Sequence, residues 1–237
     1  MDILRFENDL PEIGLSTRKK RKGKEYDLVK KYCHSLQGMK GNYALFIEPK
    51  IGNSFPDIVI VEFEKKEYER WTEKRNSLEK RDLKILNLLY KNQGIRSSEL
   101  MSNLGFSSRD VLNSIENLLD SQIIYRDNEK WKFREDQEFG IKSIKAVEAK
   151  ISNLSHAFKQ AKLNRRFASE SYVLTTSKSP ANKTLNKSEK YGVGLFSISE
   201  NGIDQKTSAS KQDLPLSHAS WYFNEWIGRY TFNSKNK

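Results

Sequence analysis

The sequence is poor in the residues that build disulfides and zinc sites. Cys33 is the single cysteine among 237 residues, so no disulfide can form within the chain. The three histidines are scattered and match no zinc-ligand spacing. A cysteine-based zinc site is therefore not expected, and the apolar helical pattern around Cys33 indicates a thiol in the core.

Long hydrophobic runs are missing as well. No stretch approaches the roughly 20 apolar residues of a membrane span. The first residues, MDILRFENDLPEIG, carry acidic side chains where a secretory signal needs basic ones. Gly192 and Gly194 precede no helix that would cap a phosphate, so dinucleotide binding is not expected either. These absences predict a cytoplasmic protein with no membrane partner.

Positive charge, by contrast, is abundant. The chain has 42 lysines and arginines against 31 acidic residues, and its formal net charge is +11. Such a chain attracts polyanions, of which nucleic acid is the first candidate. The basic run RKKRKGK at residues 18–24 fits phosphate binding and equally fits a solvated arm. Charge alone also fits a protein that merely carries surplus surface lysine.

A compact helical pattern occupies residues 80–134. Apolar residues recur at helical spacing in DLKILNLLYKN, SSELMSNLG and SSRDVLNSIENLLD. Gly105 suits the end of the second helix and Ser107 the start of the third. Two short strand-like runs, QIIYR and KWKFR, follow with a turn-like set between them. The pattern predicts three helices and a hairpin.

This order resembles the winged helix-turn-helix family, in which the third helix enters the major groove of DNA. The resemblance implies base contacts from the start of that helix and phosphate contacts from the wing. The residues that it implicates are Ser107, Ser108, Arg109 and Asn113 on the helix, and Arg126, Lys130 and Lys132 on the wing. A protein-interaction module is the alternative, because many winged helices bind protein.

The flanking segments read as alternating helices and strands. A helix is expected at KEYDLVKKYCHSL, then strands at NYALFIEPKIG and SFPDIVIVEFEKK. After Gly140 the pattern predicts a strand, a helix, two further strands and a closing helix, HASWYFNEWIGRY, whose aromatic residues suit core or dimer packing. Residues 178–190 and 204–213 read as polar loops, and residues 1–17 as an arm or a first irregular element.

Two carboxylates and a lysine stand where metal-dependent phosphodiester hydrolysis needs them. Asp57 precedes the apolar strand IVIVEF, and Glu148-Ala149-Lys150 lies within another strand-like run, IKAVEAKI. Residues two apart on a strand share a face, so Glu148 and Lys150 point the same way. Carboxylates can hold Mg²⁺, and a lysine can position the attacking water. Glu48, just before Pro49, fits a further ligand, although an exposed carboxylate at a strand end is the preferred interpretation.

These motifs resemble the PD-(D/E)XK nuclease superfamily, the fold of many restriction endonucleases. The resemblance covers roughly residues 24–64 and 140–200. It implies that Asp57 and Glu148 bind Mg²⁺, with Mn²⁺ as a possible substitute, and that Lys150 is the catalytic lysine. It further implies that Glu25 aids metal binding and that Gln160 faces the site. Members usually join the two motif strands by a short connection, whereas residues 65–140 separate them here.

An inserted winged helix accounts for that interval. The expected fold class is α/β: a restriction-endonuclease-like mixed sheet flanked by helices and interrupted by an α+β winged helix domain. The expected divisions are a first core part at 1–64, a linker at 65–79, the winged helix at 80–135 and a second core part at 136–237.

The expected function is a Mg²⁺-dependent endonuclease whose winged helix positions double-stranded DNA. Such an enzyme fits restriction or phage defence, and a homodimer or a partner subunit suits double-strand cutting. The alternative is a non-catalytic DNA-binding regulator, or an adaptor subunit of a defence or transposition complex, on a nuclease-like scaffold.

Overall fold

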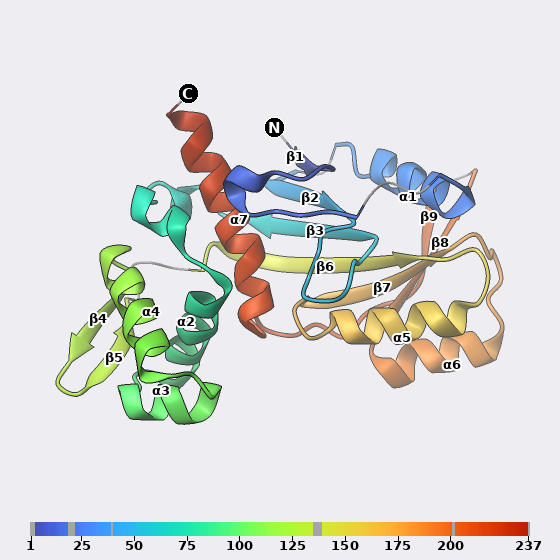
Figure 1. Ribbon diagram of the computed structural model, residues 1–237. Coiled ribbons are helices and arrows are strands. Elements are labelled where there is room, and N and C mark those ends of the chain that lie inside the picture. Colours follow the sequence, from blue (N-terminus) through green and yellow to red (C-terminus); the bar gives the residue numbers. More distant parts are fainter. Residues whose placement is uncertain (1–2, 19–21, 39, 135–138, 201, 237) are drawn as a thin grey trace. The chain divides into compact units, whose positions relative to one another are not determined.

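The computed structural model describes residues 3–18, 22–38, 40–134, 139–200 and 202–236 (Figure 1). Contacts between Cα atoms divide the chain into two compact units. Unit 1 comprises Met1–Phe63 and Ile141–Leu216, and unit 2 comprises Glu64–Gly140 and Ser217–Lys237. The chain therefore leaves unit 1 for unit 2, returns to unit 1 and ends in unit 2.

A mixed seven-stranded sheet forms the centre of unit 1, in the order β1-β2-β3-β6-β7-β8-β9. β1 is parallel to β2, the pairs β2–β3, β3–β6 and β8–β9 are antiparallel, and β6, β7 and β8 run parallel. The strands are β1 (Ile3–Phe6), β2 (Tyr43–Ile47), β3 (Ile58–Phe63), β6 (Ile141–Ala149), β7 (Glu170–Thr175), β8 (Gly194–Ser199) and β9 (Gly202–Thr207).

Helices cover both faces of this sheet (Figure 1). On one face, Leu28 and Tyr32 of α1 (Lys24–Ser35) pack on a cluster that includes Val147 and Ile198. On the other face, Phe158 of α5 packs on the sheet, and α6 lies beside α5. These helices span Leu154–Asn164 (α5) and Asn182–Tyr191 (α6), and a 3-10 turn spans Pro11–Ile13.

The double cover explains the composition of β3. Its sequence, IVIVEF, has no apolar–polar alternation, and all its residues except Glu62 are buried. A strand buried on both faces reads as a continuous apolar run. β3 and β6 are adjacent in the sheet although all of residues 64–140 lie between them in sequence.

Unit 2 contains three helices, a hairpin and a long closing helix. Their bounds are α2 (Lys80–Asn92), α3 (Ser97–Leu104), α4 (Ser108–Asp120), β4 (Ile124–Asp127), β5 (Lys130–Phe133) and α7 (His218–Lys235), and two 3-10 turns span Lys65–Tyr68 and Glu73–Ser77. Gly105 ends α3 with φ 64, in the left-handed region that favours glycine, and the Ser107 hydroxyl accepts from the backbone N–H of Asp110 at the start of α4. These caps set the short turn between the two helices.

The closing helix α7 differs from the expectation. We expected residues 136–237 to complete the core that holds the sheet, whereas α7 packs in unit 2. Trp221 is fully buried in the core of that unit, and the guanidinium of Arg75 donates to both carboxylate oxygens of Glu225 at 3.2 and 2.8 Å. Residues 65–79, expected as a linker, thus supply Arg75, which forms a buried ion pair with Glu225 of α7.

Three elements of unit 1 had no clear sequence signal. β1 lies in the stretch expected to be irregular, α6 in a segment expected to be a loop, and β9 in another. In α6 only Ser188 is buried, and in β9 no residue is. β9 is an edge strand defined by its backbone pairing with β8, so its side chains need not alternate in polarity. Among the described residues, no helix is long and apolar enough to cross a membrane.

Candidate active site and nucleic-acid interface

Asp57 and Glu148 lie next to each other across the β3–β6 pair. Ile58 is the register partner of Val147, Asp57 precedes Ile58, and Glu148 follows Val147. The same antiparallel register therefore brings both carboxylates to one face of the sheet. Asp57 Oδ2 also accepts a hydrogen bond of 2.8 Å from the backbone N–H of Ala149, which ties its carboxylate to the end of β6.

Glu148 is only 3% exposed. Its Oε1 accepts a hydrogen bond of 2.7 Å from Asn164 Nδ2 at the end of α5. Burial raises the pKa of Glu148 well above its ordinary value, and the charge of Asp57 raises it further, while Asn164 and Lys150 act in the opposite direction. A proton on one of the two carboxylates, or a cation between them, would relieve the repulsion between Glu148 and Asp57.

The carboxyl group of Asp57 responds to the same surroundings. Burial raises its pKa, while the N–H of Ala149 and the charge of Arg18 lower it. Raised pKa values on two adjacent acids from different strands are typical of functional sites.

Arg18 and Glu48 also line this site, and the sequence did not predict that they contact each other. Arg18 donates to Glu48 through Nε at 3.2 Å and through Nη2 at 2.7 Å, and its Nη2 lies 3.5 Å from Asp57 Oδ1. The side chain of Glu48 is 14% exposed, so the expectation of an exposed carboxylate was wrong. Glu48 has a positive φ of 48°, which is rare for this residue type. The sequence gives no sign of this backbone conformation, so it could not predict where the Glu48 side chain lies.

Lys150 directly follows β6 and contacts the start of α1. Its Nζ donates to Glu25 Oε2 at 2.6 Å, and its backbone N–H donates to Leu174 O at 2.8 Å. Glu25, implied as a metal-binding residue by the resemblance, is thus engaged with the lysine. The pair holds the Lys150 ammonium at the mouth of the site.

All five residues implied in catalysis line one cavity of about 690 Å³, which we call the acidic pocket. It also receives Arg18, Glu48 and His156. Gln160 enters it from α5. The Oε1 atom of Gln160 is buried and has no hydrogen-bond partner among the described residues. A buried acceptor of this kind calls for a donor or a cation.

The donor set of the acidic pocket suits a hard cation. Mg²⁺ is commonly held by one or two carboxylates together with water, and the pocket offers the carboxylates of Asp57 and Glu148 and the orphaned oxygen of Gln160. Within the ranges that the structure covers, no cluster of three or more His, Cys, Asp or Glu side chains is arranged to hold a metal ion. Glu48 and Glu25 are engaged by Arg18 and Lys150, so the carboxylates of the pocket that would hold a cation are those of Asp57 and Glu148.

The implied base-contacting residues lie at the exposed start of α4. Ser107, Ser108, Arg109 and Asn113 are all exposed. The Ser107 hydroxyl is occupied in the helix cap, where it also donates to Asp110 Oδ2 at 2.7 Å. The exposed surface of the helix also includes Leu112, which is 63% exposed and suits an apolar contact, such as that with a thymine methyl group.

The wing is a tight hairpin whose cations differ in availability. Lys132 Nζ donates to Asp127 Oδ2 at 2.6 Å, and Arg126 Nε donates to the backbone oxygen of Asn128 at 3.0 Å. Lys130 is exposed at the tip. Of the three wing cations, Lys130 is therefore the most available to a ligand. Of the basic run at 18–24, residues 19–21 lie outside the described residues.

Comparison with known proteins identifies one part of the chain. A family model described as winged helix-turn-helix DNA-binding matches residues 78–125, which confirms the winged helix expected there. No curated protein and no solved structure matches the chain. The chain thus contains a DNA-binding winged helix domain, together with a large mixed sheet flanked by helices.

Proposed function

We propose that the chain is a Mg²⁺-dependent endonuclease that cleaves DNA in the acidic pocket of unit 1 and binds DNA through the winged helix of unit 2. One observation carries the proposal: Asp57 and Glu148, from distant segments, become neighbours beside Lys150 in a single cavity. Buried like charges cost stability. Such an arrangement is best explained by a bound cation and an anionic substrate.

The residues of the pocket would divide the work of hydrolysis. Bound Mg²⁺ would neutralise charge on the phosphate and favour ionisation of a water molecule. Asp57 and Glu148 would hold the cation, and Asn164 and the N–H of Ala149 orient these two carboxylates. Lys150, held by Glu25, would orient the attacking water. The PD-(D/E)XK resemblance supports the same roles.

Cleavage of supercoiled plasmid tests the proposal. The wild-type chain should nick or cut with Mg²⁺ and not with a chelator. Asp57→Asn should reduce cutting to background, and Lys150→Ala should slow it by about 10²–10⁴-fold, the usual contribution of a group that assists proton transfer. Both variants should retain DNA binding, because the winged helix is untouched.

Asp204→Asn is the matched control, since Asp204 is exposed on the edge strand β9 and lies outside the acidic pocket. It should cut like the wild type. Undiminished cutting by Asp57→Asn or Lys150→Ala would overturn the assigned roles.

A DNA-binding regulator or adaptor is the second candidate. It is favoured by the family match, which covers the winged helix alone. This candidate predicts a Mg²⁺-independent shift of DNA in a gel with no nicking by the wild type. The plasmid assay therefore separates the two functions.

A further inference from the structure

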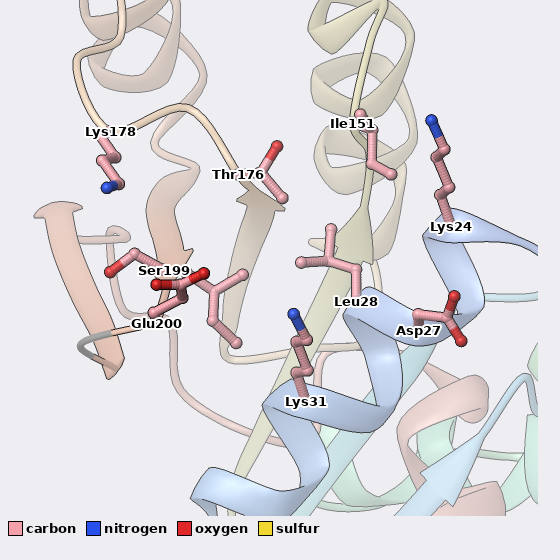
Figure 2. A pocket seen from close by; sticks show the side chains of 10 residues that line it. Lys24, Asp27, Leu28, Lys31, Ile151, Thr176, Lys178, Ser199 and Glu200 are labelled. Carbon is pink, nitrogen blue, oxygen red and sulfur yellow. The ribbon is translucent and has the colours of Figure 1, made fainter.

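Unit 1 has a second cavity of about 550 Å³, which we call the strand-end pocket (Figure 2). It shares lining residues with the acidic pocket. Three parallel strands end at it: Ile151 follows β6, Thr176 follows β7, and Ser199 ends β8. The other wall is α1. Ligands of α/β proteins bind preferentially outside the carboxyl ends of parallel strands, because the loops there diverge and leave a crevice. The position is that of a ligand site.

Three lysines surround the opening of this pocket. Lys24 and Lys31 extend from α1, and Lys178 comes from the segment after β7 (Figure 2). All three are exposed, and none has an ion-pair partner among the described residues. The rim also carries Asp27 and Glu200, so that three lysines against two carboxylates leave the lining with a formal charge of +1, and Asp27 points away from Thr176 and Ser199. The pocket therefore offers unpaired positive charge to an anion.

The interior of the strand-end pocket is less polar than its rim. Leu28 and Ile198 form the buried part, and Ile151 is 37% exposed at the edge. The aliphatic floor and the ammonium groups at the rim match a ligand that has both an apolar part and phosphate groups. A nucleotide has this build, with the sugar and base as the apolar part.

The two pockets are adjacent. Lys24 and Ile151 line both of them, and Lys150, which immediately precedes Ile151, points into the acidic pocket. Lys24 borders both pockets and Lys31 borders the strand-end pocket, so a strand whose phosphate occupies the acidic pocket can extend past Lys24 toward Lys31.

We infer that the strand-end pocket binds the phosphate groups of the substrate strand next to the bond that is cut. This inference rests on the proposed nuclease function, because that function places the strand in the acidic pocket. Lys31 and Lys178 contact the phosphates, and the aliphatic floor accommodates the adjoining sugar and base. The pocket thereby adds affinity for nucleic acid that is independent of the winged helix.

The test measures binding of a fluorescein-labelled duplex by anisotropy, in a chelator and at several salt concentrations. The full chain is compared with Lys31→Gln/Lys178→Gln. Each phosphate contact contributes about 0.9 to the slope of log affinity against log salt. Loss of two contacts should lower that slope by about 1.8 and weaken binding most at low salt.

Lys183→Gln/Lys190→Gln is the matched control. It removes the same charge from α6, which packs on the opposite face of the sheet from α1. The winged helix is identical in all three proteins, so its contribution cancels. Equal slopes for the two double variants would overturn the inference.

A free nucleotide offers the same chemistry from another source. Deoxyadenosine monophosphate is therefore titrated calorimetrically into the wild type and both double variants. Binding that is lost only in Lys31→Gln/Lys178→Gln, with duplex affinity equal to the control, assigns the pocket to a free nucleotide and overturns the strand assignment.

The readout separates this inference from the nuclease proposal. A wild type that never cuts plasmid, together with a lowered slope in Lys31→Gln/Lys178→Gln, refutes cleavage and retains the pocket as a nucleic-acid site. A wild type that cuts, together with slopes equal to the control, refutes the pocket alone.

Discussion

Two glutamates, one in each unit, are buried to a similar degree and held in opposite ways. Glu225 in unit 2 is 1% exposed and Glu148 in unit 1 is 3% exposed. Glu225 receives two hydrogen bonds from the guanidinium of Arg75. Glu148 receives one from the neutral amide of Asn164 and lies beside the carboxylate of Asp57, which raises its pKa.

The contrast separates a buried charge that is paired with an opposite charge from one that lies beside a like charge. The pair of Glu225 with Arg75 is satisfied within the protein, so its role is to fasten α7 to residues 65–79. The pair of Glu148 with Asp57 is offset only in part, by Arg18 at 3.5 Å from Asp57 and by the charge of Lys150, so an added proton or cation would stabilise it further. Burial alone therefore does not distinguish the two glutamates, whereas the sign of the nearest charged neighbour does.

The largest expected effect comes from breaking the satisfied pair. Glu225→Gln should destabilise unit 2 by about 3–5 kcal/mol, because the Arg75 guanidinium loses its charged partner in a buried place. All four tryptophans of the chain lie in unit 2, so their fluorescence in a urea titration reports that unit.

Glu148→Gln is the matched change in unit 1. It removes a buried charge that has a like-charged neighbour, so stability at neutral pH should stay the same or rise, while plasmid cutting is lost. A loss of stability from Glu148→Gln as large as that from Glu225→Gln would erase the contrast between the two glutamates.

A smaller effect is expected where α7 approaches Trp71 most closely. A Cβ atom on Gly228 would lie 2.1 Å from Trp71 Cζ3, so Gly228→Ala should destabilise unit 2 by about 1–3 kcal/mol. In an open helix the same change stabilises by roughly 0.5–1 kcal/mol. The urea midpoint by circular dichroism decides the sign.

Trp71→Leu serves as the partner variant in a double-mutant cycle. If the ring causes the cost, Gly228→Ala should be less harmful in the Trp71→Leu background than in the wild type. Equal costs in both backgrounds would assign the effect elsewhere.

The smallest expected effect is a pH dependence of stability to which Glu148 should contribute most, since the pKa of Asp57 is raised as well. The pKa of Glu148 is raised in the folded chain above the ordinary value of 4.5, so the folded state binds the proton more tightly than the unfolded state. The resulting stability is fully present below pH 4.5 and is lost as the pH rises through the raised pKa.

Melting temperature measured from pH 5 to 8 in a chelator should show this decline, and Glu148→Gln should flatten it. Mg²⁺ should raise the melting temperature most at the high end of the range, because metal binding needs the ionised carboxylates. A slope that Glu148→Gln leaves unchanged would assign the pH dependence to other groups.

The winged helix could be predicted in detail because its signals are local. Gly105 ends one helix and Ser107 begins the next within a few residues, and the apolar positions of each helix pack on those of its neighbours in sequence. Near-neighbour packing leaves a pattern that a family model also detects.

The acidic pocket could be predicted only in part. Asp57, Glu148 and Lys150 stand at strand ends, where strand periodicity and a known motif make them visible. Arg18 and Glu48 carry no such pattern, since their contact depends on the path of loops and on a left-handed backbone at Glu48. The strand-end pocket could not be predicted either, because it forms where the parallel strands β6, β7 and β8 end side by side, and the sequence does not reveal which strands run parallel.

By itself, the sequence determined the local elements: the capped helices, the buried strands and the excess of positive charge. Only the tertiary structure decided which distant segments meet, including the pairing of β3 with β6 and the packing of α7 in unit 2. The physical reason is that helix caps and apolar periodicity act over a few residues, whereas sheet pairing and buried ion pairs join residues that the sequence leaves far apart.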